Sequence, residues 1–99
     1  MIKILVEKDS YISKFEIKGH ANYSEHGSDI VCAAVSSALL TTVNAIMSFD
    51  QSIVDYEENE GFALVTCNYY NEVVDKLLVN LYNVLLELSK EYPKNIKIN

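Results

Sequence analysis

The sequence has few of the residues that break or cross-link a chain: one proline, three glycines and two cysteines in 99 residues. So little proline and glycine excludes low-complexity segments and interdomain linkers. Two cysteines, with no recognisable signal peptide before them, form no disulfide framework. We therefore expect one domain, residues 1–99, with free thiols in the reducing cytoplasm.

Basic residues are also scarce, since eight Lys and Arg stand against fourteen Asp and Glu, for a net charge of −6. Unspecific nucleic-acid binding is thereby disfavoured, because it requires Lys and Arg to neutralise phosphates. An acidic protein can attract a basic protein or peptide, although simple solubility explains the charge better when the charge is taken alone. We expect no direct nucleic-acid partner.

Alternation of apolar and polar residues predicts two β-hairpins, over residues 2–18 and 51–69. In the second hairpin, Gly61 of "NEG" would supply the positive φ of the turn. An apolar period of 3.6 predicts a helix over residues 71–92, which Pro93 ends. The last residues, "NIKIN", are a candidate short strand.

Residues 30–49 form the longest apolar run and predict a helix that is buried nearly all round. Polar residues interrupt the run and basic flanks are lacking, so a buried soluble helix explains it better than a membrane span. The resulting order is ββαββα(β). The fold class is α/β two-layer (α+β), with an antiparallel sheet and two helices packed on one face.

Three of the four His and Cys side chains fall in one short stretch, at His20, His26 and Cys32. Residues 19–28 between the second strand and the first helix are polar and aperiodic, which is typical of a loop. An active site, a metal site and coincidence beside a helix cap are the three explanations.

An active site would use Cys32 as nucleophile, because the start of a helix stabilises a thiolate through its dipole and free N–H groups. A histidine would act as general base and then as acid toward the leaving amine. His20, at the end of a strand, would be held more rigidly than His26 in mid-loop. Asp29 would either cap the helix or orient the imidazole.

Two simpler interpretations remain open on these residues alone. Cysteine is a common buried helix residue, so Cys32 could serve packing, as we expect for Cys67 in its strand. A zinc site of His20, His26, Cys32 and Asp29 has an unusual spacing, since five residues separate each successive His, His and Cys pair.

The residues from 19 to 37 identify a protein family more specifically than they identify a chemical mechanism. "GHA" at residues 19–21, Gly27, and "DIVCAAVSS" at residues 29–37 resemble the signature of the ribosomal-processing cysteine protease family, Prp. The ββαββα order, "VNAI" at residues 43–46 and the "NIKI" ending are also similar to that family. The resemblance implies a bacterial cytoplasmic cysteine endopeptidase. It would remove the N-terminal extension of a large-subunit ribosomal protein, where aromatic residues precede small ones.

The resemblance also assigns roles by position. Cys32 matches the nucleophile, His20 the catalytic histidine, and Asp29 the acidic residue three positions before the cysteine, while His26 matches no fixed residue. Family members are homodimers with a mobile loop between histidine and cysteine, so we expect the same here.

For the substrate, we expect Gly19 and Gly27 to let the loop move and Tyr23 to form an apolar wall. We expect no cofactor, no metal and no membrane. The alternative function is a non-enzymatic dimeric interaction module that binds a ribosomal partner through the same groove.

Overall fold

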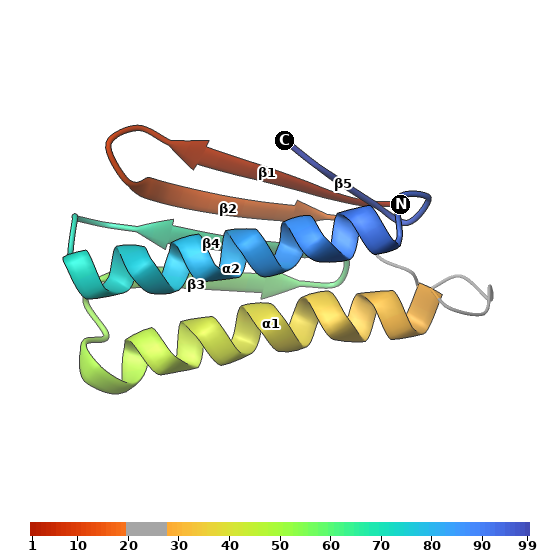
Figure 1. The fold of residues 1–99 in the computed structure, drawn as a ribbon. Coiled ribbons are helices and arrows are strands. Elements are labelled where there is room, and N and C mark those ends of the chain that lie inside the picture. The colour runs from red at the N-terminus through yellow and green to blue at the C-terminus, as the bar shows by residue number, and fades with distance from the viewer. Residues whose placement is uncertain (20–27) are drawn as a thin grey trace.

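The computed structural model describes residues 1–19 and 28–99, with side chains from residue 30 in the second range. In chain order the elements are β1 (Ile2–Lys8), β2 (Ile12–Lys18), α1 (Ser28–Phe49), β3 (Val54–Asn59), β4 (Phe62–Cys67), α2 (Glu72–Glu91) and β5 (Ile96–Ile98). Both helices pack on the same face of one sheet, which makes two layers (Figure 1). The predicted order and layering are confirmed.

The sheet has five strands in the order β3-β4-β2-β1-β5. Its first four strands pair antiparallel, as predicted. The short C-terminal strand instead runs parallel to β1, with Ile2 opposite Ile96, so the sheet is mixed. The wholly antiparallel expectation fails for this one pair, because α2 returns the chain to the end of the sheet where β1 begins (Figure 1).

The β3–β4 hairpin has the tight turn that "NEG" predicts. Asn59 pairs with Phe62, so Glu60 and Gly61 alone make the connection, and Gly61 has φ +73°. The strand β3 begins at Val54, later than the predicted residue 51. Ser52 explains the delay, because its N–H donates to the Asp50 carboxylate at 2.9 Å and turns the chain there.

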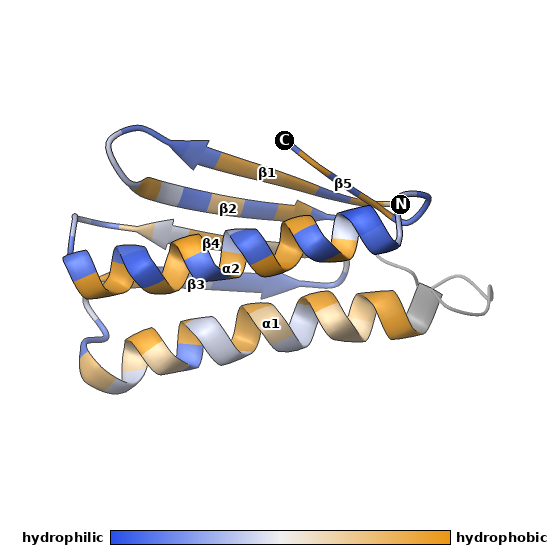
Figure 2. Ribbon diagram, in the orientation of Figure 1, coloured by the Kyte–Doolittle hydropathy of each residue, from blue (hydrophilic) through white to orange (hydrophobic). Residues whose placement is uncertain are grey.

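The core lies between the sheet and the two helices. Strand residues alternate as predicted, with Ile2, Ile4, Phe15 and Ile17 buried. The helix α2 contributes one apolar stripe to this core and a charged face to the solvent (Figure 2), the buried residues being Val74, Leu78, Leu81 and Leu85. Its first turn is capped by Asn71, whose side chain accepts from the N–H groups of Val73 and Val74.

The helix α1 is buried on one side only, which corrects the expectation of burial nearly all round. One stripe packs against α2 and the sheet, namely Val31, Val35, Leu39, Val43 and Ile46. The opposite side leaves Ile30 67% and Leu40 38% exposed. The reason is architectural, since a helix on the outside of a two-layer fold has a single covered face.

By length and composition alone, Ile30–Phe49 could cross a membrane. In the structure, one stripe of this helix, from Val31 to Ile46, is buried against the rest of the fold.

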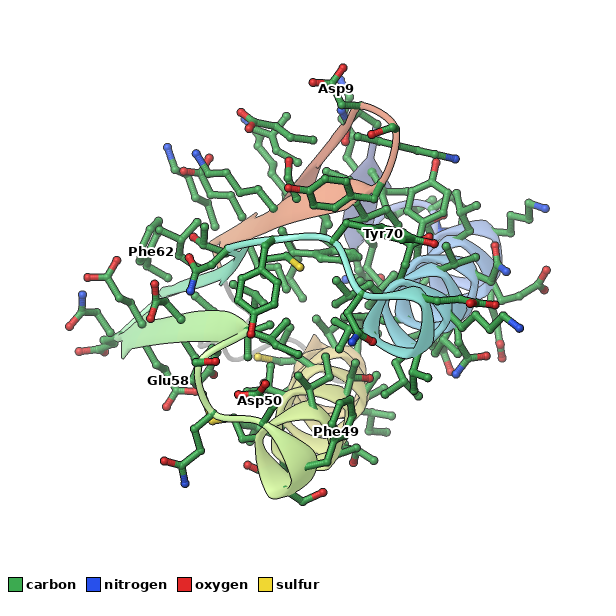
Figure 3. The ribbon with its side chains drawn as sticks, turned by 90° about the vertical axis from the view of Figure 1, so that its left-hand side faces the viewer. Asp9, Phe49, Asp50, Glu58, Phe62 and Tyr70 are labelled. Carbon is green, nitrogen blue, oxygen red and sulfur yellow. The ribbon has the colours of Figure 1, made fainter. Side chains whose placement is uncertain are left out.

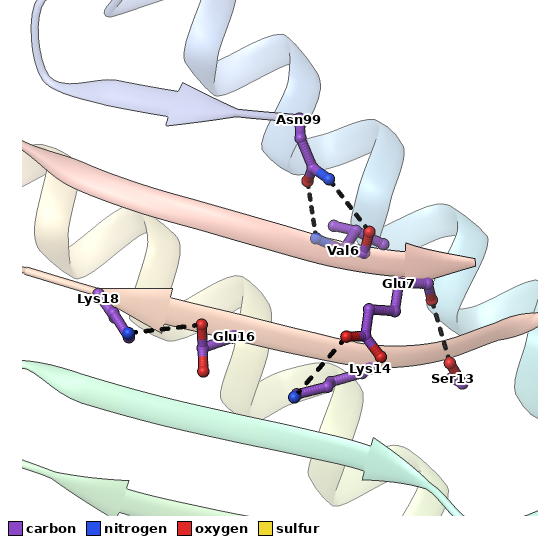
Figure 4. A network of polar contacts seen from close by, with 7 residues as sticks. All are labelled: Val6, Glu7, Ser13, Lys14, Glu16, Lys18 and Asn99. Carbon is purple, nitrogen blue, oxygen red and sulfur yellow. Dashed lines mark hydrogen bonds and ion pairs between the residues drawn. The ribbon is translucent and has the colours of Figure 1, made fainter.

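The face of the sheet that the helices leave open is polar. On this face Lys14 lies 3.9 Å from Glu7 and Lys18 lies 3.8 Å from Glu16 (Figure 4). At the edge of β1, the side chain of Asn99 accepts from the Val6 N–H at 2.7 Å and donates to the Val6 carbonyl at 3.3 Å.

Candidate active site

A cleft of about 540 Å³ lies between the first half of α1 and the β3–β4 hairpin. Cys32, Ala33 and Ser36 line it from the helix. Tyr56, Glu58 and Phe62 line it from the hairpin, and Gly19 closes it at the end of β2. The cleft therefore brings the predicted nucleophile beside the backbone that leads into the predicted histidine.

Cys32 is a free thiol, partly exposed, and packs against the edge of the core. Because α1 begins at Ser28, Cys32 is the fifth residue of the helix. Its own N–H can therefore pair with the carbonyl of Ser28, and the free N–H groups belong to the first turn before it. The Cα–Cβ bond of a helical residue tilts toward the N-terminus, so the Cys32 side chain leans over that first turn.

Asp29 is the second residue of α1, in the first turn of the helix. An acidic residue in a first turn is favourable, because the positive end of the helix dipole lies there. Both the capping and the orienting role of Asp29 remain predictions.

Gly19 is held firmly at the end of β2. Its N–H donates to the carbonyl of Gly61 at 2.9 Å, and its φ is +80°. A Cβ at this position would overlap the carbonyl oxygen of Met1. These contacts give Gly19 a packing role at the end of β2, and the predicted movement of the loop that follows it stays a prediction.

The remaining predicted site residues, His20, Tyr23, His26 and Gly27, lie outside the described residues. In the described ranges, no three His, Cys, Asp or Glu residues cluster as metal ligands would. The zinc alternative relies on both histidines, so these ranges leave it a hypothesis with no added support.

The second wall of the cleft was missed by sequence reasoning. Tyr56 and Glu58 are two residues apart on β3 and share the face that looks toward α1. The Tyr56 hydroxyl donates to the Glu58 carboxylate at 2.6 Å. Burial first, and then this carboxylate, raise the pKa of Tyr56 to about 12. No local sequence signal marks this wall, because it forms only when β4 pairs with β2 and places Gly61 beside Gly19.

Cys67 differs from Cys32 in its burial. It is 6% exposed in the core, and its S–H donates to the Tyr69 carbonyl at 3.2 Å. Burial raises the pKa of the Cys67 thiol. The predicted packing role of Cys67 is confirmed, which leaves Cys32 as the thiol with access to solvent.

A second set of polar contacts surrounds Asp50, which directly follows Phe49 at the C-terminal end of α1 (Figure 3) and does not line the cleft. There the Ser52 hydroxyl donates to Asp50 at 2.6 Å and lies 2.9 Å from the Tyr69 hydroxyl. Hydrogen bonds from Ser52, through its side chain and then its backbone, lower the pKa of Asp50. These contacts close the turn into β3, so they are structural.

The chain is similar to known proteins that are named cysteine proteases. The family model described as "Cysteine protease Prp" matches residues 1–97. A protein of Staphylococcus aureus (strain Mu50 / ATCC 700699) named ribosomal processing cysteine protease Prp is 30% identical over 101 residues, covering 99% of this chain and 95% of that protein. The protein of the same name from Bacillus subtilis (strain 168) is 31% identical, covering 91% and 87%.

Solved structures agree with these sequence matches. The S. aureus processing protease in complex with a substrate peptide has a TM-score of 0.90 at 26% identity, covering 100% of this chain and 98% of that one. The same enzyme with a covalently linked product peptide has a TM-score of 0.83 at 28% identity, with the same coverage.

Proposed function

Because the chain belongs to the Prp family of cysteine proteases, we propose that it removes the N-terminal extension of a large-subunit ribosomal protein in the bacterial cytoplasm. The main observation in support is the cleft that Cys32 and Gly19 both line, because Gly19 is the residue before His20. The names of the relatives support ribosomal processing, and the peptide complexes of the S. aureus enzyme support a peptide substrate.

The proposed chemistry is acyl transfer through a Cys32–His20 dyad. His20 takes the thiol proton as the Cys32 sulfur attacks the carbonyl carbon of the scissile bond. His20 then gives that proton to the leaving amine, which leaves a thioester on Cys32. A water that His20 deprotonates attacks the thioester, and the proton returns to the sulfur as the acid product departs. The covalently linked product peptide on the S. aureus relative supports such an intermediate.

The first turn of α1 would assist both charged species. A thiolate that leans over this turn lies near the positive end of the helix dipole. The free N–H groups of Ser28, Asp29 and Ile30 are also the nearest backbone donors of the helix for a developing oxyanion. In this proposal Asp29 orients the imidazolium of His20 when the proton is on the ring.

The test is mass spectrometry of a precursor peptide that carries the extension with an aromatic-aromatic-small segment. Wild type and Cys67→Ala should each give two fragments, because Cys67 lies outside the cleft. Cys32→Ala and His20→Ala should leave the peptide intact. Cleavage by Cys32→Ala at the wild-type rate refutes the assignment. An intact peptide that nevertheless binds all four proteins favours the interaction module.

We also propose that two copies associate through the exposed side of α1. This side carries apolar and small uncharged residues, which contact a second copy without like-charge repulsion, whereas the open face of the sheet carries ion pairs. Leu40 on α1 and Leu5 on β1 are both exposed leucines, at 38% and 50%, and represent the two candidate surfaces.

The pair of leucines gives a matched test. In sedimentation equilibrium, wild type and Leu5→Glu should have the mass of two chains, and Leu40→Glu the mass of one. The converse result would move the interface to the sheet. A wild-type protein with the mass of one chain would refute the homodimer.

A further inference from the structure

The cleft has an acidic side that the catalytic chemistry does not use. Glu58 and Glu60 line it opposite Cys32, and no Lys or Arg does so among the described residues. The cleft volume of about 540 Å³ is in the range of clefts that enclose small ligands or side chains. The neighbourhood of the nucleophile therefore has the opposite charge to a basic side chain.

Glu58 is exposed, and one hydrogen bond orients its carboxylate. The Tyr56 hydroxyl donates to its Oε2 atom at 2.6 Å, and the tyrosine ring is partly buried against the core. Since the pKa of Tyr56 is about 12, this hydroxyl keeps its proton at neutral pH and remains a donor. A carboxylate fixed in this way loses less side-chain entropy when it binds a ligand.

Tyr56 and Glu58 also offer two complementary groups to one cation. The carboxylate retains a second oxygen for a charge-assisted hydrogen bond. The face of a tyrosine ring attracts ammonium and guanidinium groups and covers an aliphatic stem. An acidic side chain would be repelled by the Glu58 carboxylate, and a purely apolar side chain could contact only the Tyr56 ring.

We infer that Glu58, positioned by Tyr56, is a specificity determinant that accepts a Lys or Arg side chain of the peptide bound across the Cys32 cleft. This inference rests on the proposed peptide-cleaving function for its biological meaning. The binding preference itself depends only on the cleft, so it can be measured without turnover.

The experiment compares peptides in the Cys32→Ala protein by fluorescence anisotropy. The peptides are identical except that each position within four residues of the cleaved bond carries Lys, Gln or Glu in turn. We expect at least one position at which Lys binds about fivefold more tightly than Gln, the size of a partly exposed charge pair. Raising the salt concentration should reduce this preference.

Neighbouring glutamates supply the matched control. Glu57 precedes Glu58 on β3 but points to the opposite face of the sheet, where it lines no part of the Cys32 cleft. Glu58→Gln should abolish the Lys preference and Glu58→Lys should turn it into a preference for Glu, whereas Glu57→Gln should leave it unchanged. Tyr56→Phe should weaken it, because the carboxylate is no longer held.

The outcomes separate this inference from the proposed function. A Lys preference that survives Glu58→Gln, or the absence of any preference or of any binding, overturns the inference. A Glu58-dependent preference in a protein with Cys32 intact that cleaves none of the peptides upholds the inference and refutes the protease assignment. Cleavage of the peptides without any charge preference overturns the inference and upholds the protease assignment.

Discussion

The backbone N–H of Gly19 donates a hydrogen bond of 2.9 Å to the carbonyl oxygen of Gly61. This contact joins the end of β2 to the turn of the β3–β4 hairpin, and both residues line the Cys32 cleft. The point from which the chain enters His20 is therefore fixed by the same turn that forms the opposite wall.

Gly19→Ala should destabilise the protein by about 2 kcal/mol, because a left-handed backbone with a Cβ costs about 1–2 kcal/mol and this Cβ also meets the Met1 carbonyl. Urea unfolding measures the change. The control is Gly61→Asn, since asparagine tolerates the left-handed region in a hairpin turn. Equal stability of Gly19→Ala and wild type would contradict the close packing at Gly19.

Thiol labelling should distinguish the two cysteines. In the folded protein, iodoacetamide at pH 8 should modify Cys32 and leave Cys67 unmodified, since Cys67 is buried and its raised pKa keeps the thiol protonated. Urea should expose both thiols. Peptide mapping by mass spectrometry identifies the modified residue. Rapid labelling of Cys67 under native conditions would show that the β4 core opens.

Asp50 should titrate below its ordinary value of 3.8, and the cause can be assigned. The hydrogen bond from the Ser52 hydroxyl is the largest contribution, and Ser52→Ala removes it while keeping the backbone N–H, so Ser52→Ala should raise the pKa of Asp50 more than Tyr69→Phe does. NMR titration of the Asp50 carboxyl carbon measures both. If Tyr69→Phe raised the pKa of Asp50 more than Ser52→Ala does, Tyr69 and not Ser52 would be the main cause of the lowered pKa.

The sign of the linked stability follows from the lowered pKa. A carboxyl that is more acidic in the folded state contributes stability above its unfolded pKa, and this contribution is lost as the pH falls through the folded value. Asp50→Asn should therefore make unfolding less dependent on pH below about 4. If the free energy of unfolding, measured by urea titration, fell with acid equally in Asp50→Asn and wild type, Asp50 would contribute nothing to stability in that pH range.

Asn99→Ala should destabilise the β1–β5 edge by about 1 kcal/mol, because the Asn99 amide forms two hydrogen bonds with the backbone of Val6 (Figure 4). Lys97→Ala, an exposed neighbour on β5, is the control and should have a small effect. Amide hydrogen exchange at Val6 should quicken in the Asn99 variant alone. If both variants protect Val6 equally, the Asn99 amide is not what secures this edge.

The sequence predicts most of the fold because local periodicity determines it. Alternation over residues 2–18 and the 3.6 period over residues 71–92 identify the elements that the structure contains. The side of α1 that stays exposed could not be predicted, because an almost wholly apolar helix does not show which face the sheet covers. The parallel pairing of β5 with β1 depends on where α2 ends, which is a tertiary property.

The site also contains residues that the sequence predicts and residues that only the structure reveals. Cys32 and Gly19 were identified by the local motif, and the structure places them in one cleft. Tyr56 and Glu58 were missed, because in the sequence they are ordinary members of an alternating strand. Only the pairing of β4 with β2 carries them to the side of α1, and such long-range pairing has no local signal.

The strand β3 forms one edge of the sheet, and β5 forms the other. It carries three acidic side chains and no basic one, with Asp55 and Glu57 on the open face and Glu58 on the cleft face. An uncovered edge strand is a template for another strand, and in many proteins this leads to edge-to-edge aggregation. Here two copies of β3 would bring like charges together, so the edge repels its own copies. The net charge of the edge therefore protects the folded protein from self-assembly at the very strand that borders the cleft.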